Sequence, residues 1–262
     1  GTIRAYQQAL TLHLMPINLI GVAISNAAFP QLTERLGEGR LDLFQKDLRS
    51  LLRIIFWMAL PTSVVIFFTR GYIVHFIRNT GDQLMAGILG CLVVAILFRT
   101  IYHMAARAFY ARQDTKTPLY ISVFSISLNI ALAIILTMNL NMGAYGLAWA
   151  QSTVAVFEVV ILLLVMSKQM PRMFNRAFVK AIGKMIAASA VAGVVCYIGV
   201  SVMPFRDTDS SFFSAFPKFT IISIVSFGVY LLMSKLLRLP EVDPILKKGK
   251  KLLFGRLDGV WR

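Results

Sequence analysis

Seven long apolar segments divide the sequence, and charged or polar stretches separate them. Six contain no Asp, Glu, Lys or Arg, and one is interrupted only by Glu158. They cover residues 5–33, 54–69, 83–98, 119–140, 143–166, 185–205 and 219–234. A helix needs roughly 20 mainly apolar residues to cross the hydrocarbon core of a bilayer. The shorter runs reach that length when flanking Lys and Arg side chains extend to the interface. The pattern therefore predicts an all-α polytopic membrane protein with about seven transmembrane helices.

The same pattern predicts how these helices are grouped. Near residues 37–50, apolar positions recur every three or four residues among charged ones, which is typical of an amphipathic helix at the inner membrane surface. We expect residues 1–170 to form five transmembrane helices together with this surface helix. Residues 171–237 should form two terminal transmembrane helices, and residues 238–262 a basic cytoplasmic tail.

Composition supports a membrane protein and argues against an enzyme. The chain is 57% hydrophobic and 15% charged, whereas soluble domains carry about 25% charged residues. Both cysteines, Cys91 and Cys196, fall within apolar segments, which suggests neither a disulfide framework nor a metal site. The three histidines lie in different segments, and no nucleophile motif or phosphate-binding glycine loop occurs. We expect no catalytic residues, no metal and no cofactor, so the chemistry available is binding and conformational exchange.

The distribution of positive charge predicts the topology. The net charge is +15, and 21 of the 27 Lys and Arg lie in the connections after the first, third, fifth and seventh spans. An excess of cations on alternate loops marks those loops, and here the C-terminus, as cytoplasmic. The charge is therefore a topology signal and not a nucleic-acid footprint. Because the chain begins at Gly1 and enters a helix almost at once, we expect it to be a piece of a longer protein.

Three basic residues near the end of the third span form a ladder. Arg99, His103 and Arg107 are spaced four residues apart, so they stack along one helix face. Arg107 alone could be an ordinary interface cation, and Arg99 could extend its side chain toward the interface. Taken together, the three indicate a cation-lined cavity suited to an anionic phosphate group, because a charge at the depth of Arg99 is costly unless it faces protein or water.

Other polar groups within the apolar segments are candidates for the same cavity. Glu158 could be a proton or cation site, the partner of an arginine, or a structural hydrogen-bonding group near Gln151. His13 and Asn18 flank Pro16, where a kink is expected, and they either line a cavity or make polar contacts between helices.

Two motifs carry a resemblance to a known family. The first is RAFYARQDTKTPL, residues 107–119, after the third span, and the second is LMPINLIGVAISNAAFPQLTERL, residues 14–36. In combination they resemble the MurJ/MviN family of lipid II flippases, in the multidrug/oligosaccharidyl-lipid/polysaccharide exporter superfamily. Members have two pseudo-symmetric lobes and two extra C-terminal helices. The resemblance implies that this chain is the C-terminal half, with most of one lobe and the extra pair.

The resemblance also implies a function and residue roles. The family moves the undecaprenyl-pyrophosphate-linked peptidoglycan precursor, lipid II, across the bacterial inner membrane by alternating access. Arg99 and His103 would face the central cavity, and Thr11 stands where members usually carry an arginine. An inner gate and hinge would be formed by Arg107, Asp114, Lys116 and Pro118, with Pro16 at the helix kink.

The resemblance leaves several alternatives open. Some members bind sodium through an Asn and an Asp one turn apart, and here Asn129 is followed at that step by Ala133. The expected partners are a polyprenyl-pyrophosphate-linked glycan lipid, membrane lipids and the missing N-terminal lobe, with no nucleic acid. The alternatives are an exporter of another polyprenyl-linked glycan or small molecule, and a non-transporting membrane scaffold.

Overall fold

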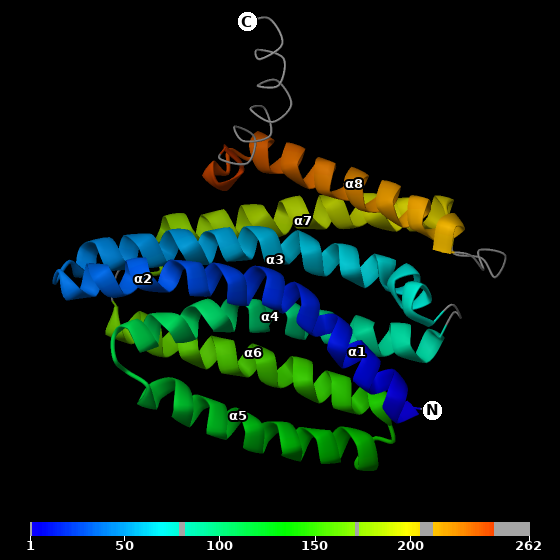
Figure 1. The fold of residues 1–262 in the computed structure, drawn as a ribbon, viewed down its shortest axis with the longest axis horizontal. Helices are drawn as coiled ribbons and strands as arrows, with labels where there is room; N and C mark the ends of the chain where they lie inside the picture. Colours follow the sequence, from blue (N-terminus) through cyan, green and yellow to red (C-terminus); the bar gives the residue numbers. More distant parts are fainter. Residues whose placement is uncertain (1, 79–81, 171–172, 205–211, 244–262) are drawn as a thin grey trace, which may run out of the picture.

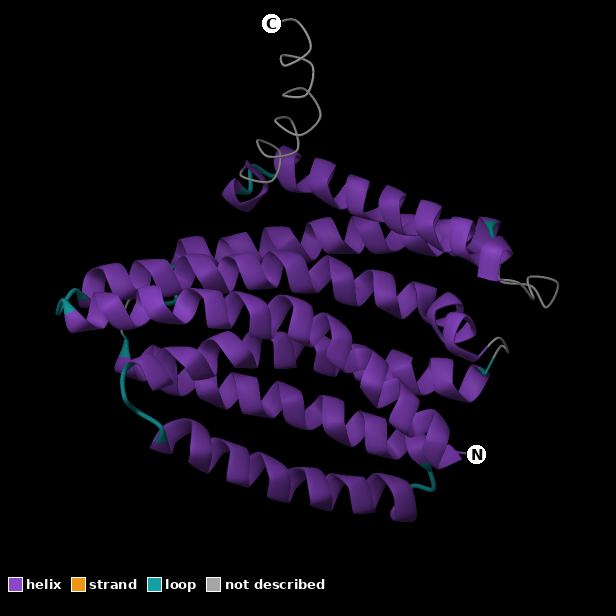
Figure 2. Cartoon of the chain, viewed as in Figure 1, coloured by secondary structure: helices purple, strands orange, loops and turns teal. Residues whose placement is uncertain are grey.

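The chain is almost entirely helical in the computed structural model, which describes residues 2–78, 82–170, 173–204 and 212–243 (Figure 2). The helices are α1 (Thr2–Pro16), η1 (Ile17–Val22), α2 (Ala23–Gly37), α3 (Leu41–Arg78), α4 (Gln83–Ala111), α5 (Lys116–Ile134), η2 (Ile135–Asn139), α6 (Ala144–Gln169), α7 (Arg176–Val202), α8 (Phe212–Leu236) and η3 (Pro240–Val242). Within the described residues there is no β-strand, and seven helical rods are long and apolar enough to cross a membrane. The predicted fold class is confirmed, and each predicted span overlaps one of these rods.

The helices lie side by side in a row, with one rod across it (Figure 1). α8 packs on α7, α7 on α3, α3 on α4, α4 on α6, and α6 on α5, while the rod formed by α1, η1 and α2 lies against α4 and α3. The connections after α2, α4 and α6 gather at one end of the bundle (Figure 1), which we call the basic end because the predicted cytoplasmic loops lie there.

The first rod bends because of Pro16. Proline has no backbone N–H and cannot donate the hydrogen bond that would continue the α-helical ladder. The six residues after it, Ile17–Val22, form a π-helical turn before α2 resumes the ordinary helix. Gly21 lies in this turn and is buried against α4, where a Cβ would stand 2.9 Å from the carbonyl oxygen of Thr100.

The amphipathic segment predicted near residues 37–50 is continuous with the second span. α3 begins at Leu41 and runs without interruption to Arg78. Phe44 and Leu48 are fully buried in the core shared with α2 and α4, so packing extends the helix beyond the hydrophobic span. This segment is the first part of α3 and not a separate helix. Of the predicted tail, residues 244–262 lie outside the described residues.

α4 is the centre of the bundle and α5 is its least covered helix. Along α4, the fully buried residues of one hydrophobic cluster end at Ile96 and those of the next begin at Ile101, so Arg99 lies where the two clusters meet. α5 packs mainly on α6, and many of its large apolar side chains are exposed, among them Val123, Phe124 and Ile130. Such a face suits contact with hydrocarbon or with another helix.

Candidate functional site

An ion pair crosses the middle of the bundle from α4 to α6. Arg99 Nη1 lies 2.8 Å from Glu158 Oε2, and the two side chains are 26% and 3% exposed. About 18 Å of helix separates Arg99 from the end of α4 at Ala111. Among the possibilities that the sequence leaves open for Glu158, the structure has an arginine partner. Each charge neutralises the other, so neither is buried unpaired in a setting of low polarity.

The second oxygen of Glu158 links the pair to α5. Ser122 Oγ donates to Glu158 Oε1 at 3.2 Å, and Tyr102 Oη lies 2.9 Å from Ser122 Oγ. The chain of contacts joins α4, α5 and α6 at one level. Gln151, the other candidate partner of Glu158, contacts α5 instead: its side-chain oxygen accepts from Asn129 Nδ2 at 2.7 Å. Asn129 therefore lies in a second α5–α6 contact.

The last residue of the ladder, Arg107, contacts the first rod. Arg107 Nη2 donates to Asn26 Oδ1 at 2.7 Å, and its guanidinium lies 5.4 Å from the centroid of the Phe29 ring. Arg107 thus connects α4 to α2 near the basic end. His103 is half-buried between the two arginines along the helix, and its ring packs edge-on against Tyr102.

The polar residues around Pro16 separate into two groups. His13 is buried and its Nδ1 contacts the carbonyl oxygen of Leu10, within electrostatic range of Arg99. Thr11 and Asn18 are exposed, and the Thr11 hydroxyl donates to the carbonyl of its own helix at Gln7. The structure therefore brings His13 to the Arg99 region, whereas Thr11 and Asn18 lie at the surface of this chain.

The connection between α4 and α5 is a tight, hydrogen-bonded turn. Asp114 accepts from the backbone N–H of Thr117 at 3.0 Å and from its hydroxyl at 2.7 Å. These bonds hold the pKa of the Asp114 carboxyl below its ordinary value. Pro118 is buried in the first turn of α5. Backbone N–H groups in the first turn have no partner within the helix, so proline costs no hydrogen bond there. Lys116 is exposed. Asp114 and Pro118 thus fix the start of α5.

Three contact residues escape prediction from the sequence. Ser122, Tyr102 and Asn26 contact the candidate side chains, but their types are common in membrane helices, and the partners lie 20 to 81 residues apart. Periodicity could place Tyr102 beside Arg99 on α4, but it could not indicate which helix packs against them. A partner assignment of that kind needs the tertiary arrangement.

The fold and this polar layer define a multi-pass helical membrane protein with a charged network deep in its bundle. The sequence model of the family described as "Lipid II flippase MurJ" matches residues 1–217. The chain therefore belongs to the MurJ family.

Named relatives agree along almost the whole chain. A probable lipid II flippase MurJ of Thermotoga maritima is 28% identical over 95% of this chain, and one of Rhizobium tropici is 21% identical over 96%. The chain covers 49% and 48% of those proteins, so it spans about half the length of the curated relatives that it matches. A solved structure of lipid II flippase MurJ in an inward closed conformation has the same fold, with a TM-score of 0.73 and 24% identity, over 90% of this chain and 47% of the other.

Proposed function

We propose that the protein containing this chain moves lipid II across a bacterial inner membrane by alternating access. The observation that carries the proposal is the Arg99–Glu158 pair, with two histidines within electrostatic range of Arg99. Family membership supplies the substrate class, and the site supplies the chemistry. A guanidinium with a resident carboxylate partner is suited to exchange that carboxylate for a pyrophosphate.

Exchange of partners explains why a carboxylate stands beside the binding cation. An unpaired charge in a bundle of low polarity is destabilising by several kcal/mol. When pyrophosphate oxygens bind Arg99, Glu158 moves away but retains the hydrogen bond from Ser122. When substrate leaves on the other side, Glu158 returns. Neither step leaves a bare guanidinium, so Arg99 has a counter-anion in both the empty and the loaded state.

The remaining candidate residues would move or guide the helices. Arg107, Asp114, Lys116 and Pro118 would act at the inner gate, and the Pro16 bend would allow the first rod to change its angle. His13, His103, Thr11 and Asn18 would line the route of the headgroup, on the side completed by the N-terminal lobe. The basic end would face the cytoplasm, in keeping with its excess of Lys and Arg.

Export of another polyprenyl-linked glycan is the second candidate. It is favoured by Thr11, a neutral residue at a position where the family usually carries an arginine. For either substrate, Asn129 is the residue that could belong to a sodium site. Its side-chain amide contacts Gln151 and not a carboxylate. We therefore do not include a sodium site in the proposal.

Complementation tests the proposed function directly. The full-length gene, expressed in a strain depleted of its own lipid II flippase, should restore growth. A variant carrying Arg99→Ala and His103→Ala should reach the membrane in normal amounts and fail to restore growth. Arg70→Ala is the matched control, because Arg70 is also a cation at the end of a span but contacts the Phe67 carbonyl and lies beside Gly90, nine residues before Arg99 on α4. Growth with the double variant would contradict the proposed role of Arg99 and His103, and failure of the native gene to restore growth would favour another substrate or a scaffold role.

A further inference from the structure

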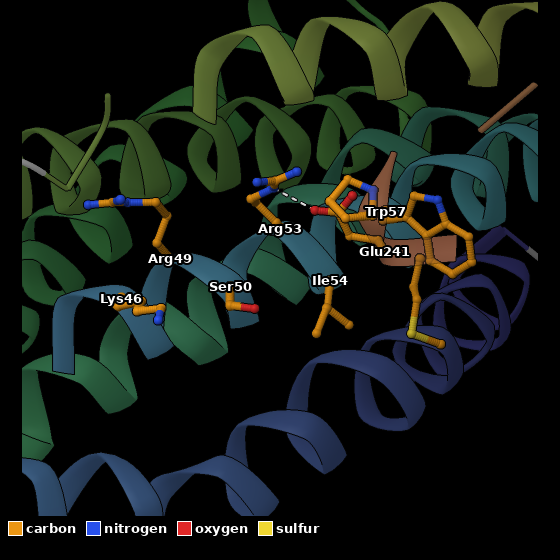
Figure 3. A pocket seen from close by; sticks show the side chains of 9 residues that line it. Lys46, Arg49, Ser50, Arg53, Ile54, Trp57 and Glu241 are labelled. Atoms are coloured by element: carbon orange, nitrogen blue, oxygen red, sulfur yellow. Dashed lines mark ion pairs between the residues drawn. The ribbon is translucent and has the colours of Figure 1, made fainter. Parts of the chain in front are cut away.

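A second group of cations lines a cavity outside the ladder. The cavity has a volume of about 430 Å³ and lies between the first half of α3 and the short helix η3 (Figure 3). Lys46, Arg49 and Arg53 lie along it at three- and four-residue spacing, with Ser50 among them. Figure 3 shows these side chains along one helix, with Trp57 and Glu241 at the other end of the cavity.

The charges lining this cavity do not cancel. Arg53 forms an ion pair with Glu241 at 2.5 Å, and the Glu241 side chain is only 6% exposed. Arg49 donates through Nε to the carbonyl oxygen of Met173, which orients the guanidinium. With three cations and one carboxylate, the lining carries a net charge of +2. Glu241 compensates the charge of Arg53. The remaining positive charge makes the site suited to an anion.

The other wall of the cavity is apolar. Ile54, Trp57 and Met58 continue the same face of α3 into the uncharged run that begins at Ile54. Trp57 and Met58 also line an adjoining cavity of about 170 Å³ between α3 and α8, whose walls include Phe227 and Leu231. The two cavities together are charged at one end and apolar at the other.

The apolar wall is held in place by α8. Trp57 donates its indole N–H to Ser234 at 3.1 Å, and Tyr230 donates its hydroxyl to the carbonyl of Trp57 at 2.8 Å. These bonds fix the indole at the level where charged residues give way to apolar ones, which is the usual depth of tryptophan at a membrane interface. The cavity is thus formed before any ligand arrives.

We propose that this cavity binds an anionic glycerophospholipid from the leaflet at the basic end. The phosphate would lie among Lys46, Arg49 and Ser50, and an acyl chain would follow Ile54 and Met58 toward α8. A free phosphate would have no contact with the apolar wall. The C-terminal segment 244–262 is a poor occupant, because its own Lys and Arg outnumber its acidic residues. The inference requires only that the chain crosses a membrane, and is independent of what the protein transports.

Native mass spectrometry of the full-length protein in detergent tests the site. Phosphatidylglycerol should bind more tightly than phosphatidylcholine with the same acyl chains. Lys46→Gln should weaken phosphatidylglycerol binding about fivefold, and Lys46→Gln with Arg49→Gln about 25-fold, since each cation near an anionic lipid contributes about that factor. Lys46 is exposed, so its single variant should fold even if loss of the Arg49–Met173 bond disturbs the double variant.

The matched control removes two exposed cations at the same end, Lys168→Gln and Lys180→Gln, which do not line the cavity. It should leave phosphatidylglycerol binding unchanged. Equal losses in the control and pocket variants would overturn the proposal, as would equal binding of the two phospholipids. Glycerol 3-phosphate that competes as well as the lipid would exclude a role for the apolar wall. If Lys46→Gln weakens undecaprenyl phosphate binding but not phosphatidylglycerol binding, the cavity belongs to the transported lipid and our assignment is wrong.

Discussion

At the scale of single residues, the ion pair between Arg99 and Glu158 is the main feature of the polar layer. Glu158 is almost completely buried, and besides Arg99 it has a hydrogen bond from Ser122. Arg99 is a quarter exposed, so it can reach a ligand without leaving the bundle. In the proposed function, the two charges therefore stabilise each other in the empty protein, and Arg99 becomes available when substrate replaces Glu158.

Single and double substitutions should reveal the coupling. Arg99→Gln should lower the free energy of unfolding by about 3 kcal/mol, because it leaves Glu158 buried without a countercharge. Glu158→Gln should have a smaller effect, because Arg99 is partly exposed. The double variant should be more stable than the sum of the two losses predicts. Thermal unfolding in detergent measures all three, with Arg70→Gln as the control. Additive losses would mean that the pair contributes no coupling energy.

The turn residue Asp114 should give a pH-dependent contribution. Its bonds to Thr117 lower the pKa of the carboxyl below its ordinary value of 3.8. The carboxylate therefore stabilises the folded state fully above that value, and its contribution disappears as the pH falls through the lowered pKa. We expect the difference in melting temperature between the native protein and Asp114→Asn to shrink between pH 6 and pH 3. A difference that stays constant with pH would show that the charge on Asp114 is not responsible.

At the scale of helices, close contact between the first rod and α4 sets the geometry around Arg99. The π-helical turn after Pro16 brings Gly21 against Thr100, the residue next to Arg99. Sequence periodicity predicts both helices and the bend at Pro16. It does not predict that α3 continues from the amphipathic segment into the span, because burial of Phe44 and Leu48 depends on neighbours that are distant in the sequence.

Gly21→Ala should separate these helices. The added methyl would lie 2.9 Å from the Thr100 carbonyl oxygen and 3.0 Å from its Cα, and backbone atoms cannot move aside as a flexible side chain can. Overpacking of this kind destabilises by about 1–3 kcal/mol. Gly37→Ala is the control, since nothing lies within 4 Å of its Cβ position. Thermal unfolding measures both, and a native melting temperature for Gly21→Ala would contradict the packing described.

At the scale of the whole molecule, sequence reasoning predicts the helical class, the spans and the charge asymmetry, because hydrophobic length and cation placement are properties of single segments. It identifies Arg99 and Glu158 separately, since each is a charge in an apolar setting. It cannot pair them, because 59 residues separate them and only the packing of α4 against α6 brings them together. The cavity beside η3 is unpredicted for the same reason: its cations belong to α3, and Glu241 follows α8.

Cysteine labelling should test the orientation of the bundle. With Cys91 and Cys196 replaced by serine, a cysteine at Thr115 should be protected from a membrane-impermeant thiol reagent in intact cells. A cysteine at Asn141, in the connection at the opposite end, should be labelled. Lysis should make Thr115→Cys reactive, which controls for burial. Labelling of Thr115→Cys in intact cells would reverse the topology.

The most direct test of the account measures lipid II in the outer leaflet of cells that depend on this protein, comparing the native sequence with the Arg99→Gln and Glu158→Gln double variant. Because the double variant removes the binding cation and its countercharge together, it should accumulate in the membrane and unfold near the native temperature. The amount of lipid II in the outer leaflet should be at least tenfold lower than with the native sequence. If a folded double variant gives the native amount of lipid II in the outer leaflet, the claim that Arg99 binds the pyrophosphate in exchange for Glu158 is wrong.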